Sequence, residues 1–318
     1  MEDSSPAVAA LIATMDRPTY VRGAIESACE QTHERIEVVV VDSSSDDDTR
    51  DVVEEMRQAY PDRAFTYIHS DASLPAARNQ GAAETDAEYI AFLDDDDRWR
   101  PGKIARQVNA FDAGGDSLGL VHTGYEGVDE DGECVLTFTP EYEGSIYPDL
   151  LVRNAIGTPS SVMVRRDAFE DVRGFDESLR YCEDWDFYLR IAREYEFDYV
   201  PELLVERTYH DGAMTEDLAP LFTYRARVLE KHADTLVAYG VRDLAWRRHY
   251  RDAGERHLKA DNRTEARAAY YALLSEQRDL RAVVVYSLLS VLPPGAVLRT
   301  VRSLVSFERR LRGPDPTN

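Results

Sequence analysis

The chain has 318 residues, of which 43% are hydrophobic, so it is long enough for one large domain or for a core domain with an appendage. Its 60 Asp and Glu against 37 Lys and Arg give a formal charge of −23. Such a surface argues against nucleic acid as a partner, because there is no basic stripe to neutralise the phosphates. It favours a high-salt cytoplasm, in which ions screen the repulsion between the acidic side chains. The composition therefore predicts a halophilic source.

The three cysteines, Cys29, Cys134 and Cys182, have neither metal-ligand nor redox spacing, so we expect free or buried thiols in a reducing compartment. Residues 1–6 are acidic and lack the basic and apolar regions of a secretory signal. No run reaches the roughly 18 apolar residues that a membrane-spanning helix needs. These observations predict a cytoplasmic protein.

The first hundred residues alternate between apolar runs and amphipathic segments. Buried strands are predicted at 7–13, 36–41, 65–69 and 89–93, and helices at 18–31, through 52–56, and at 76–83. This alternation is typical of an α/β fold with a doubly wound, mostly parallel sheet, whose ligands bind at the carboxyl ends of the strands. Asp42 and Asp94 both stand at such ends.

The pattern changes after Trp99. Short strands are predicted at 119–125, 134–138, 160–164 and 197–205, and a helix at 183–192. From residue 219 the apolar spacing is helical, at 219–238, 243–258 and 264–274. We therefore expect residues 1–215 to form the domain that carries the site and residues 216–318 to form a helical C-terminal region.

The end of the helical region differs from the rest in charge. Residues 282–312 carry five arginines, with apolar residues such as Val297, Val301 and Leu304 on one helical face. Two interpretations stay open for this basic amphipathic tail. It is either a peripheral contact with an anionic lipid surface, on the inner face of the cell membrane, or an ordinary packed terminal helix.

The most informative stretch is the apolar run 88–93, which leads directly into Asp94, Asp95, Asp96 and Asp97. Four adjacent carboxylates repel one another unless a cation or a row of donors holds them. Hard divalent ions are bound by one or two carboxylates together with phosphate oxygens, so Asp94 and Asp96 can serve one metal and diphosphate unit. A solvated acidic loop is the alternative.

Several common site motifs are absent from the sequence. No Gly-rich phosphate loop follows a strand, and there is neither a Gly-x-Ser-x-Gly elbow nor a His-Glu-x-x-His pair. Hydride transfer, P-loop phosphoryl transfer and zinc hydrolysis are therefore disfavoured, and carboxylate chemistry remains.

Four stretches together resemble the signatures of family-2 inverting glycosyltransferases with the GT-A fold, which include enzymes of archaeal and bacterial surface-glycan and lipid-linked glycan assembly. They lie within residues 5–215, in the order and spacing of the family: Ala13-Thr14-Met15-Asp16-Arg17-Pro18, Val40-Val41-Asp42-Ser43-Ser44-Ser45, the run from Ala77-Arg78-Asn79-Gln80-Gly81 to Asp97, and Gly174-Phe175-Asp176-Glu177 followed by Cys182-Glu183-Asp184-Trp185-Asp186. Ala13, Asp16, Ser43 and Ser44 depart from the usual residues.

The resemblance implies a nucleotide-diphosphate sugar as donor, a glycan or lipid-linked acceptor, and Mn²⁺ or Mg²⁺ as cofactor. It implies Asp184 as the catalytic base, with Glu183 supporting Asp184 or the acceptor. The remaining roles that it implies are nucleotide binding by Thr14, Arg17, Asp42, Arg78 and Asp94, and metal binding by Asp94, Asp96 and, as a further ligand, His210.

Each of these residues also has a purely structural interpretation. Asp42 can be a helix cap, Arg78 a surface ion pair, Asp184 a complement to a helix dipole, and His210 an ordinary loop residue. Trp99 and Trp185 are expected in the core. Two other functions stay open as well, namely a sugar nucleotidyltransferase and a nucleotide-sugar-binding module without catalysis.

Overall fold

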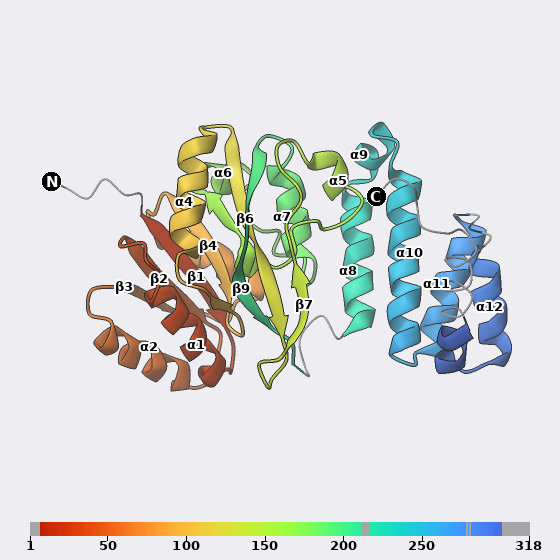
Figure 1. The fold of residues 1–318 in the computed structure, drawn as a ribbon, viewed down its shortest axis with the longest axis horizontal. Helices are drawn as coiled ribbons and strands as arrows, with labels where there is room; N and C mark the ends of the chain where they lie inside the picture. The colour runs from red at the N-terminus through yellow and green to blue at the C-terminus, as the bar shows by residue number, and fades with distance from the viewer. Residues whose placement is uncertain (1–6, 211–216, 278, 280, 301–318) are drawn as a thin grey trace. The chain divides into compact units, whose positions relative to one another are not determined.

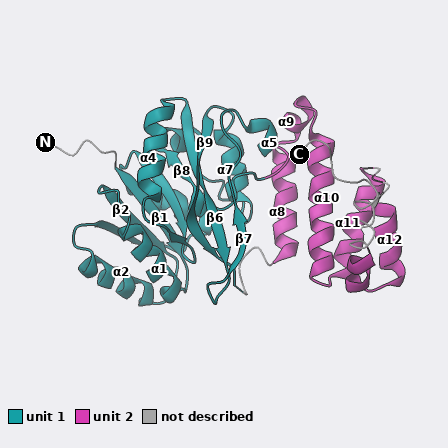
Figure 2. Cartoon of the chain, in the orientation of Figure 1, with its two compact units in different colours: residues 1–150, 154–213 teal, residues 151–153, 214–318 magenta. Residues whose placement is uncertain are grey.

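The computed structural model describes residues 7–210, 217–277, 279 and 281–300, and the chain divides into two compact units. Unit 1 comprises residues 1–150 and 154–213, and unit 2 comprises residues 151–153 and 214–318 (Figure 2). Unit 1 combines a sheet with helices, whereas unit 2 is built of helices (Figure 1).

Unit 1 is organised around one sheet with the strand order β3-β2-β1-β4-β8-β6-β9-β5, and β7 pairs with β6 beside this path. β3, β2, β1 and β4 run parallel, as do β6 and β9, whereas β8, β7 and β5 pair antiparallel to their neighbours. The mostly parallel sheet confirms the predicted fold class. The strands are β1 (Val8–Thr14), β2 (Ile36–Asp42), β3 (Ala64–His69), β4 (Tyr89–Asp94), β5 (Arg98–Trp99), β6 (Leu118–Val128), β7 (Cys134–Phe138), β8 (Met163–Arg165) and β9 (Glu196–Thr208).

β1, β2 and β4 are buried on both faces, which explains why their sequences are almost continuously apolar. Val8, Ala10 and Ile12 of β1 pack into the main core, while Leu11 lies against the other face near Gly81. The helices of unit 1 are α1 (Pro18–Cys29), α2 (Asp48–Ala59), α3 (Leu74–Ala83), α4 (Lys103–Gly114), α5 (Tyr147–Leu150), α6 (Arg166–Asp171) and α7 (Glu183–Ile191), together with the short 3₁₀ helix η1 (Pro159–Ser161).

An aromatic cluster attaches α6 and α7 to the sheet. The ring of Phe92 in β4 contacts those of Phe175 and Phe187 edge to face, with centroid separations of 5.2 and 6.0 Å. Phe169 of α6 completes the cluster. Because β4 ends in the acidic run, this packing fixes the start of α7 beside the end of that strand.

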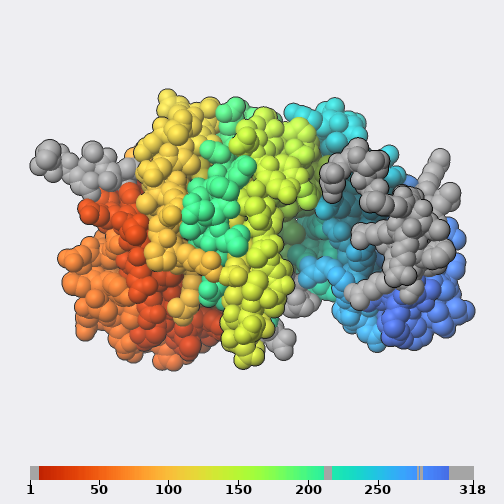
Figure 3. Space-filling view, in the orientation of Figure 1, coloured from red at the N-terminus to blue at the C-terminus, as the bar shows by residue number. Residues whose placement is uncertain are grey.

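Two sequence predictions are wrong in detail. The strand predicted at 160–164 begins only at Met163, since Ser160 and Ser161 belong to η1, where Ser160 donates its hydroxyl to Asp97. The helix predicted at 219–238 is interrupted at His232, which separates α8 (Leu218–Lys231) from α9 (Ala233–Ala238). β6 and β7 pair as an antiparallel hairpin, and Gly132 in its turn has φ +79°. The yellow-green segment that includes β7 is visible on the face shown in Figure 3, and its residues 134–137 are exposed.

Unit 2 continues with α10 (Arg242–Lys259), α11 (Arg263–Ser275) and α12 (Arg281–Val291). Leu258, Leu273 and Leu289 form its core, and the fully buried Val297 packs with them. At Val297 the chain therefore packs as an ordinary terminal helix would, which is one of the two interpretations of the tail. Residues 301–312 of that tail lie outside the described residues. Within the described part of the chain, no helix is both long and apolar enough to cross a bilayer.

Candidate functional site

The carboxyl ends of the parallel strands bring the predicted residues to one edge of the sheet. Thr14 of β1 pairs in register with Asp42 of β2, and Ala13 pairs with Asp94 of β4. In a doubly wound sheet, this edge is where ligands bind. Three of the predicted nucleotide residues, Thr14, Asp42 and Asp94, therefore end neighbouring strands.

The four consecutive aspartates divide into an inner and an outer pair. Asp95 accepts from the hydroxyl of Thr14 at 2.7 Å, and Asp97 accepts from the Ser160 hydroxyl at 2.6 Å and from the Thr208 amide at 3.1 Å. Burial raises the pKa of Asp95 to about 6 and that of Asp97 well above its ordinary value. Asp94 and Asp96 are only half-buried. This outer pair, Asp94 and Asp96, is the pair that the sequence predicted to serve the metal and the diphosphate.

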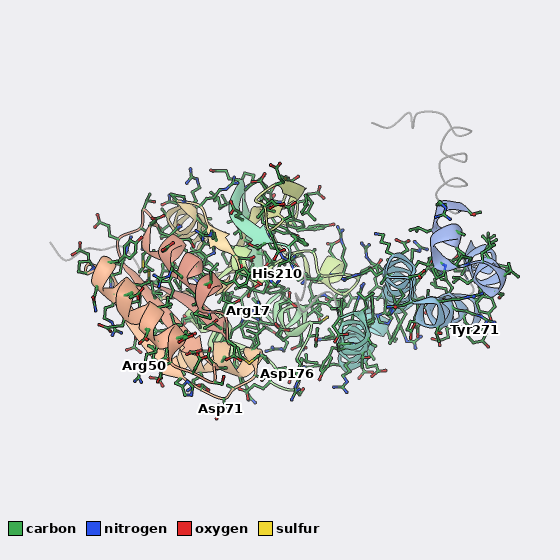
Figure 4. The ribbon with its side chains drawn as sticks, turned by 90° about the horizontal axis from the view of Figure 1, so that it is seen from below. Arg17, Arg50, Asp71, Asp176, His210 and Tyr271 are labelled. Atoms are coloured by element: carbon green, nitrogen blue, oxygen red, sulfur yellow. The ribbon has the colours of Figure 1, made fainter. Side chains whose placement is uncertain are left out.

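Arg17 and His210 converge on Asp96 from opposite ends of unit 1. Arg17 Nη1 lies 3.1 Å from Asp96 Oδ2, and His210 Nε2 lies 3.0 Å from the same oxygen. The imidazole also stacks on the ring of Tyr20, with centroids 5.2 Å apart. Figure 4 labels Arg17 and His210 at this edge. The structure thus brings together three residues that are up to 193 positions apart in the sequence.

Arg78 joins the acidic run to the first turn of α7. Its Nη2 donates to Asp94 Oδ1 at 2.7 Å, and its Nη1 donates to Glu183 Oε1 at 2.8 Å. The guanidinium is almost fully buried and lies 5.3 Å above the centre of the Phe175 ring. This environment contradicts the interpretation of Arg78 as a surface ion pair.

The residues that follow Arg78 explain the spacing of two of the sequence motifs. Asn79 accepts from the amide of Phe175 at 2.8 Å and donates to its carbonyl at 2.9 Å. A Cβ added at Gly81 would lie 2.9 Å from Val41 Cγ2, so only glycine lets α3 approach the sheet this closely. Both residues hold α3 where Arg78 reaches its two carboxylates.

Asp184 is the second residue of α7 and is half-buried beside Glu183. Its two carboxylate oxygens accept from the Asn154 amide at 2.9 Å and from the Trp185 backbone N–H at 2.7 Å. Burial raises the pKa of Asp184, both hydrogen bonds and Arg78 lower it, and Asp94 raises it. Because Arg78 bridges Asp94 to Glu183, the residue before Asp184, the predicted base lies near the acidic run.

Glu183 and Asp42 are more enclosed than the sequence indicates. Burial raises the pKa of Glu183 to about 7, against the lowering effect of Arg78. The carboxylate of Asp42 is completely buried and accepts from the Tyr67 hydroxyl at 2.7 Å and the Ser44 amide at 2.9 Å. Ser44, which departs from the family pattern, thus orients Asp42.

Asp96 and His210 supply two side-chain ligands of the kinds that a divalent cation takes. Asp96 offers a carboxylate and His210 an imidazole nitrogen, whereas Asp94 already pairs with Arg78. In the part of the chain that the structure describes, no three His, Cys, Asp or Glu side chains form a complete metal site. Magnesium-type ions commonly take one or two protein ligands and complete their shell with phosphate oxygens and water. Asp96 and His210 therefore fit a cation that is shared with a bound diphosphate.

Sequence reasoning missed two residues of this site. Asn154, which orients Asp184, stands in a segment without a motif. Tyr188 is one helical turn after Asp184, and its buried hydroxyl has no hydrogen-bond partner among the described residues. Burial raises the pKa of Tyr188 well above its ordinary value, and Asp184 raises it further. The helical spacing of Asp184 and Tyr188 was the available signal for the latter.

Comparison with known sequences gives a family model described as glycosyl transferase family 2, which matches residues 10–173. An uncharacterized glycosyltransferase of Rickettsia typhi is 27% identical over 218 residues, a segment that spans 66% of this chain and 66% of that protein. A Bacillus subtilis glycosyltransferase named for teichuronic acid biosynthesis, TuaG, is 27% identical over 167 residues, which cover 52% of this chain and 65% of TuaG.

Comparison with solved structures gives the same fold. TarS residues 1–349 of S. aureus align with a TM-score of 0.59 at 16% identity, over 95% of this chain and 92% of that one. The mannosyltransferase PcManGT of Pyrobaculum calidifontis aligns with a TM-score of 0.57 at 17% identity, over 94% of this chain and 80% of that one. The TM-scores show a shared fold, and at these low identities they show the fold alone.

Proposed function

Because the chain belongs to glycosyl transferase family 2, we propose that it is a metal-dependent, inverting glycosyltransferase that takes its sugar from a nucleotide-diphosphate donor. The observation that carries this proposal is the bridge from Asp94 through Arg78 to Glu183, which joins the acidic run to the helix of Asp184. One site thus holds groups for the donor diphosphate and a carboxylate for the acceptor.

The donor side of the site is formed at the ends of β1, β2 and β4. Arg17, Arg78 and Asp94 are proposed to hold the ribose and diphosphate. Asp42, whose carboxylate is completely buried, is proposed to shape the end of β2 beside the base. Other proteins with this fold support the donor class, since TarS residues 1–349 form a complex with UDP-GlcNAc, and PcManGT forms one with GDP-Man and Mn²⁺.

A divalent cation fits between Asp96, His210 and the diphosphate. When bound, Mn²⁺ or Mg²⁺ would neutralise charge on the departing nucleoside diphosphate. Arg17, which pairs with Asp96 at 3.1 Å, is placed to exchange that contact for one with the phosphate oxygens. These residues orient the leaving group at the sheet edge.

Asp184 is proposed as the general base. Its carboxylate takes the proton of the acceptor hydroxyl while that oxygen forms a bond to the anomeric carbon, and the bond from this carbon to the diphosphate oxygen breaks. Attack opposite the leaving group inverts the configuration. The hydrogen bonds from Asn154 and the Trp185 amide hold the ionised carboxylate in place, and general-base assistance is typically worth about 10² to 10⁴ in rate.

The acceptor is proposed to be a lipid-linked or surface glycan. Two observations support this acceptor class. They are the relative named for teichuronic acid biosynthesis and the arginine-rich residues 282–312. A peripheral membrane contact through this segment belongs to the same proposal.

The proposal is tested by incubating the protein in high salt with UDP-, GDP- and dTDP-sugars, with and without Mn²⁺. We expect one donor to raise the melting temperature most strongly with Mn²⁺ present and to be hydrolysed slowly or transferred. Donor binding without any turnover would instead indicate a binding module, and release of inorganic pyrophosphate from a sugar phosphate and a nucleoside triphosphate would indicate a nucleotidyltransferase.

A further inference from the structure

Unit 2 carries a surface hollow of about 430 Å³ that belongs to no motif of the catalytic domain. It is lined by Arg263, Thr264, Arg267, Ala268 and Tyr271 of α11 and by Tyr286 of α12. Its volume falls within the range of about 300 to 1,000 Å³ that is usual for small-molecule sites. Figure 4 labels Tyr271 on this unit.

The lining residues of α11 form one stripe. Arg263, Arg267 and Tyr271 follow one another at intervals of four residues, so they lie on the same helical face. Glu265, two residues from each arginine, falls on another side of the helix, where it acts electrostatically on His257 of α10. The stripe is therefore basic and aromatic, without an acid in it.

The two guanidinium groups are oriented but not neutralised. Arg263 Nε donates to the carbonyl of Leu289 at 2.7 Å, in the last turn of α12, and Arg267 Nη2 donates to the Tyr286 hydroxyl at 3.3 Å. Among the described residues, neither has a carboxylate within ion-pair distance. In a chain with 60 Asp and Glu, two arginines that face a hollow without an acidic partner are available to an anion.

The tyrosines supply an apolar surface beside these charges. Tyr271 is 58% exposed, its ring centre lies 5.9 Å from that of Tyr286, and the guanidinium of Arg267 lies 5.0 Å from the centre of the Tyr286 ring. The C–H face of a pyranose ring packs on an aromatic ring, while a carboxylate pairs with the fork of an arginine.

The charge of the surrounding chain favours the same ligand class. Residues 214–318 carry 18 Lys and Arg against 13 Asp and Glu, whereas residues 1–213 carry 19 against 47. The net charge is thus +5 in the helical region and −28 in the remainder. The helical region thus carries a basic excess, which favours an anionic ligand, and a short ligand with one or two carboxylates needs only the local arginines.

We propose that the hollow of Arg263, Arg267, Tyr271 and Tyr286 binds a carboxylate-bearing oligosaccharide of the uronic acid type. A sugar ring stacks on Tyr271 and its carboxylate pairs with Arg267 and Arg263. This binding is independent of the proposed sugar transfer, since it requires neither donor, metal nor Asp184.

Titration calorimetry of the full chain with trigalacturonate, and with maltotriose as the neutral counterpart, tests the proposal. We expect trigalacturonate to bind at least tenfold more tightly, with an affinity that falls as salt increases. R267Q and Y271A should each weaken binding at least tenfold, and R267K should retain most of it. The matched surface variants R242Q and Y239A, also in unit 2, should leave the affinity for trigalacturonate unchanged, and so should D184N.

Several results would overturn the proposal. They are the absence of trigalacturonate binding, equal affinity for maltotriose, or full affinity in R267Q and Y271A with unchanged melting temperatures. Stronger binding of inorganic phosphate, or of vesicles of anionic phosphatidylglycerol, that is lost in R267Q would identify a phosphate or lipid site instead. Because no donor is present, loss of transferase activity and loss of this binding are separate outcomes.

Discussion

Arg78 and Glu183 are 105 positions apart in the sequence, yet their side chains meet at 2.8 Å with less than a tenth of either exposed. The same guanidinium holds Asp94 at 2.7 Å. A buried charge is costly when its partner is removed, although a complete pair adds little net stability. Loss of either partner is therefore expected to affect both the stability of the fold and the alignment of the site.

Removal of Arg78 alone should destabilise the protein strongly. R78M leaves Glu183 buried without its partner, and we expect a loss of about 3 to 5 kcal/mol in unfolding free energy. The double variant R78M/E183L removes both charges and should lose less than R78M. Denaturant unfolding in high salt measures both values. Equal losses in the two variants would show that an unpaired Glu183 is not the source of the lost stability.

Replacement of Asp184 should abolish transfer without loss of the fold. D184N retains the shape of the side chain but cannot take a proton, so we expect a fall in kcat of about 10² to 10⁴, with unchanged donor binding. Asp167, an exposed aspartate in the first turn of α6, offers the matched control D167N, which should keep full activity. Substantial turnover by D184N would remove Asp184 from its proposed role.

The pH dependence should report the environment of Asp184. The base must be ionised, so activity falls as pH drops through its pKa, which burial raises above the ordinary value of 3.8. The Asn154 hydrogen bond favours the ionised form, so its removal in N154A should shift the acidic limb of kcat to higher pH. A pH profile of both proteins measures this shift. An unmoved limb would mean that another group titrates.

The cation should depend on Asp96 and His210 together with a diphosphate. Mn²⁺ titration followed by electron paramagnetic resonance, with UDP or GDP present, should show tight binding in the wild type and at least tenfold weaker binding in D96N and H210A. E177Q changes an exposed acid of the Gly174-Phe175-Asp176-Glu177 motif and should bind Mn²⁺ normally. Unaltered Mn²⁺ affinity in D96N would place the ion elsewhere.

The close approach of α3 to the sheet should make Gly81 intolerant of a side chain. In G81A the new methyl group meets Val41 and Leu11 at about 3 Å, so we expect a loss of about 1 to 3 kcal/mol from overpacking. The exposed glycine Gly115 is unsuitable as a control position, because its φ of +70° would itself strain any other residue. A better control is Q80A on the same helix, whose half-buried side chain should cost less, as measured by thermal unfolding.

The alternation of apolar strands and helices was sufficient to predict the parallel half of the sheet, because strands buried on both faces have continuous apolar sequences. The second half was less predictable. η1 occupies part of an expected strand. Its Ser160 donates to Asp97, a contact between distant segments that no local pattern reveals. The interruption at His232 separates two helices within one helical periodicity.

The candidate site was predictable where motifs end strands, as for Thr14, Asp42 and Asp94. It was not predictable where distant segments supply single residues, as for Asn154. Arg78 illustrates both cases. Its place in a motif was visible from the sequence, but its burial between two carboxylates depends on α7, which meets α3 only in the folded chain.

The four aspartates after β4 are chemically identical, so the run itself contains no information about which side chains turn inward. That choice is made by the groups that receive them, namely the hydroxyls of Thr14 and Ser160 and the amide of Thr208. If these hydrogen-bond donors were lost, the register of the run would not be fixed. A shift by one residue would then exchange the inner and the outer pair. Three neutral groups thus specify which carboxylates of the run turn inward and which remain for the site.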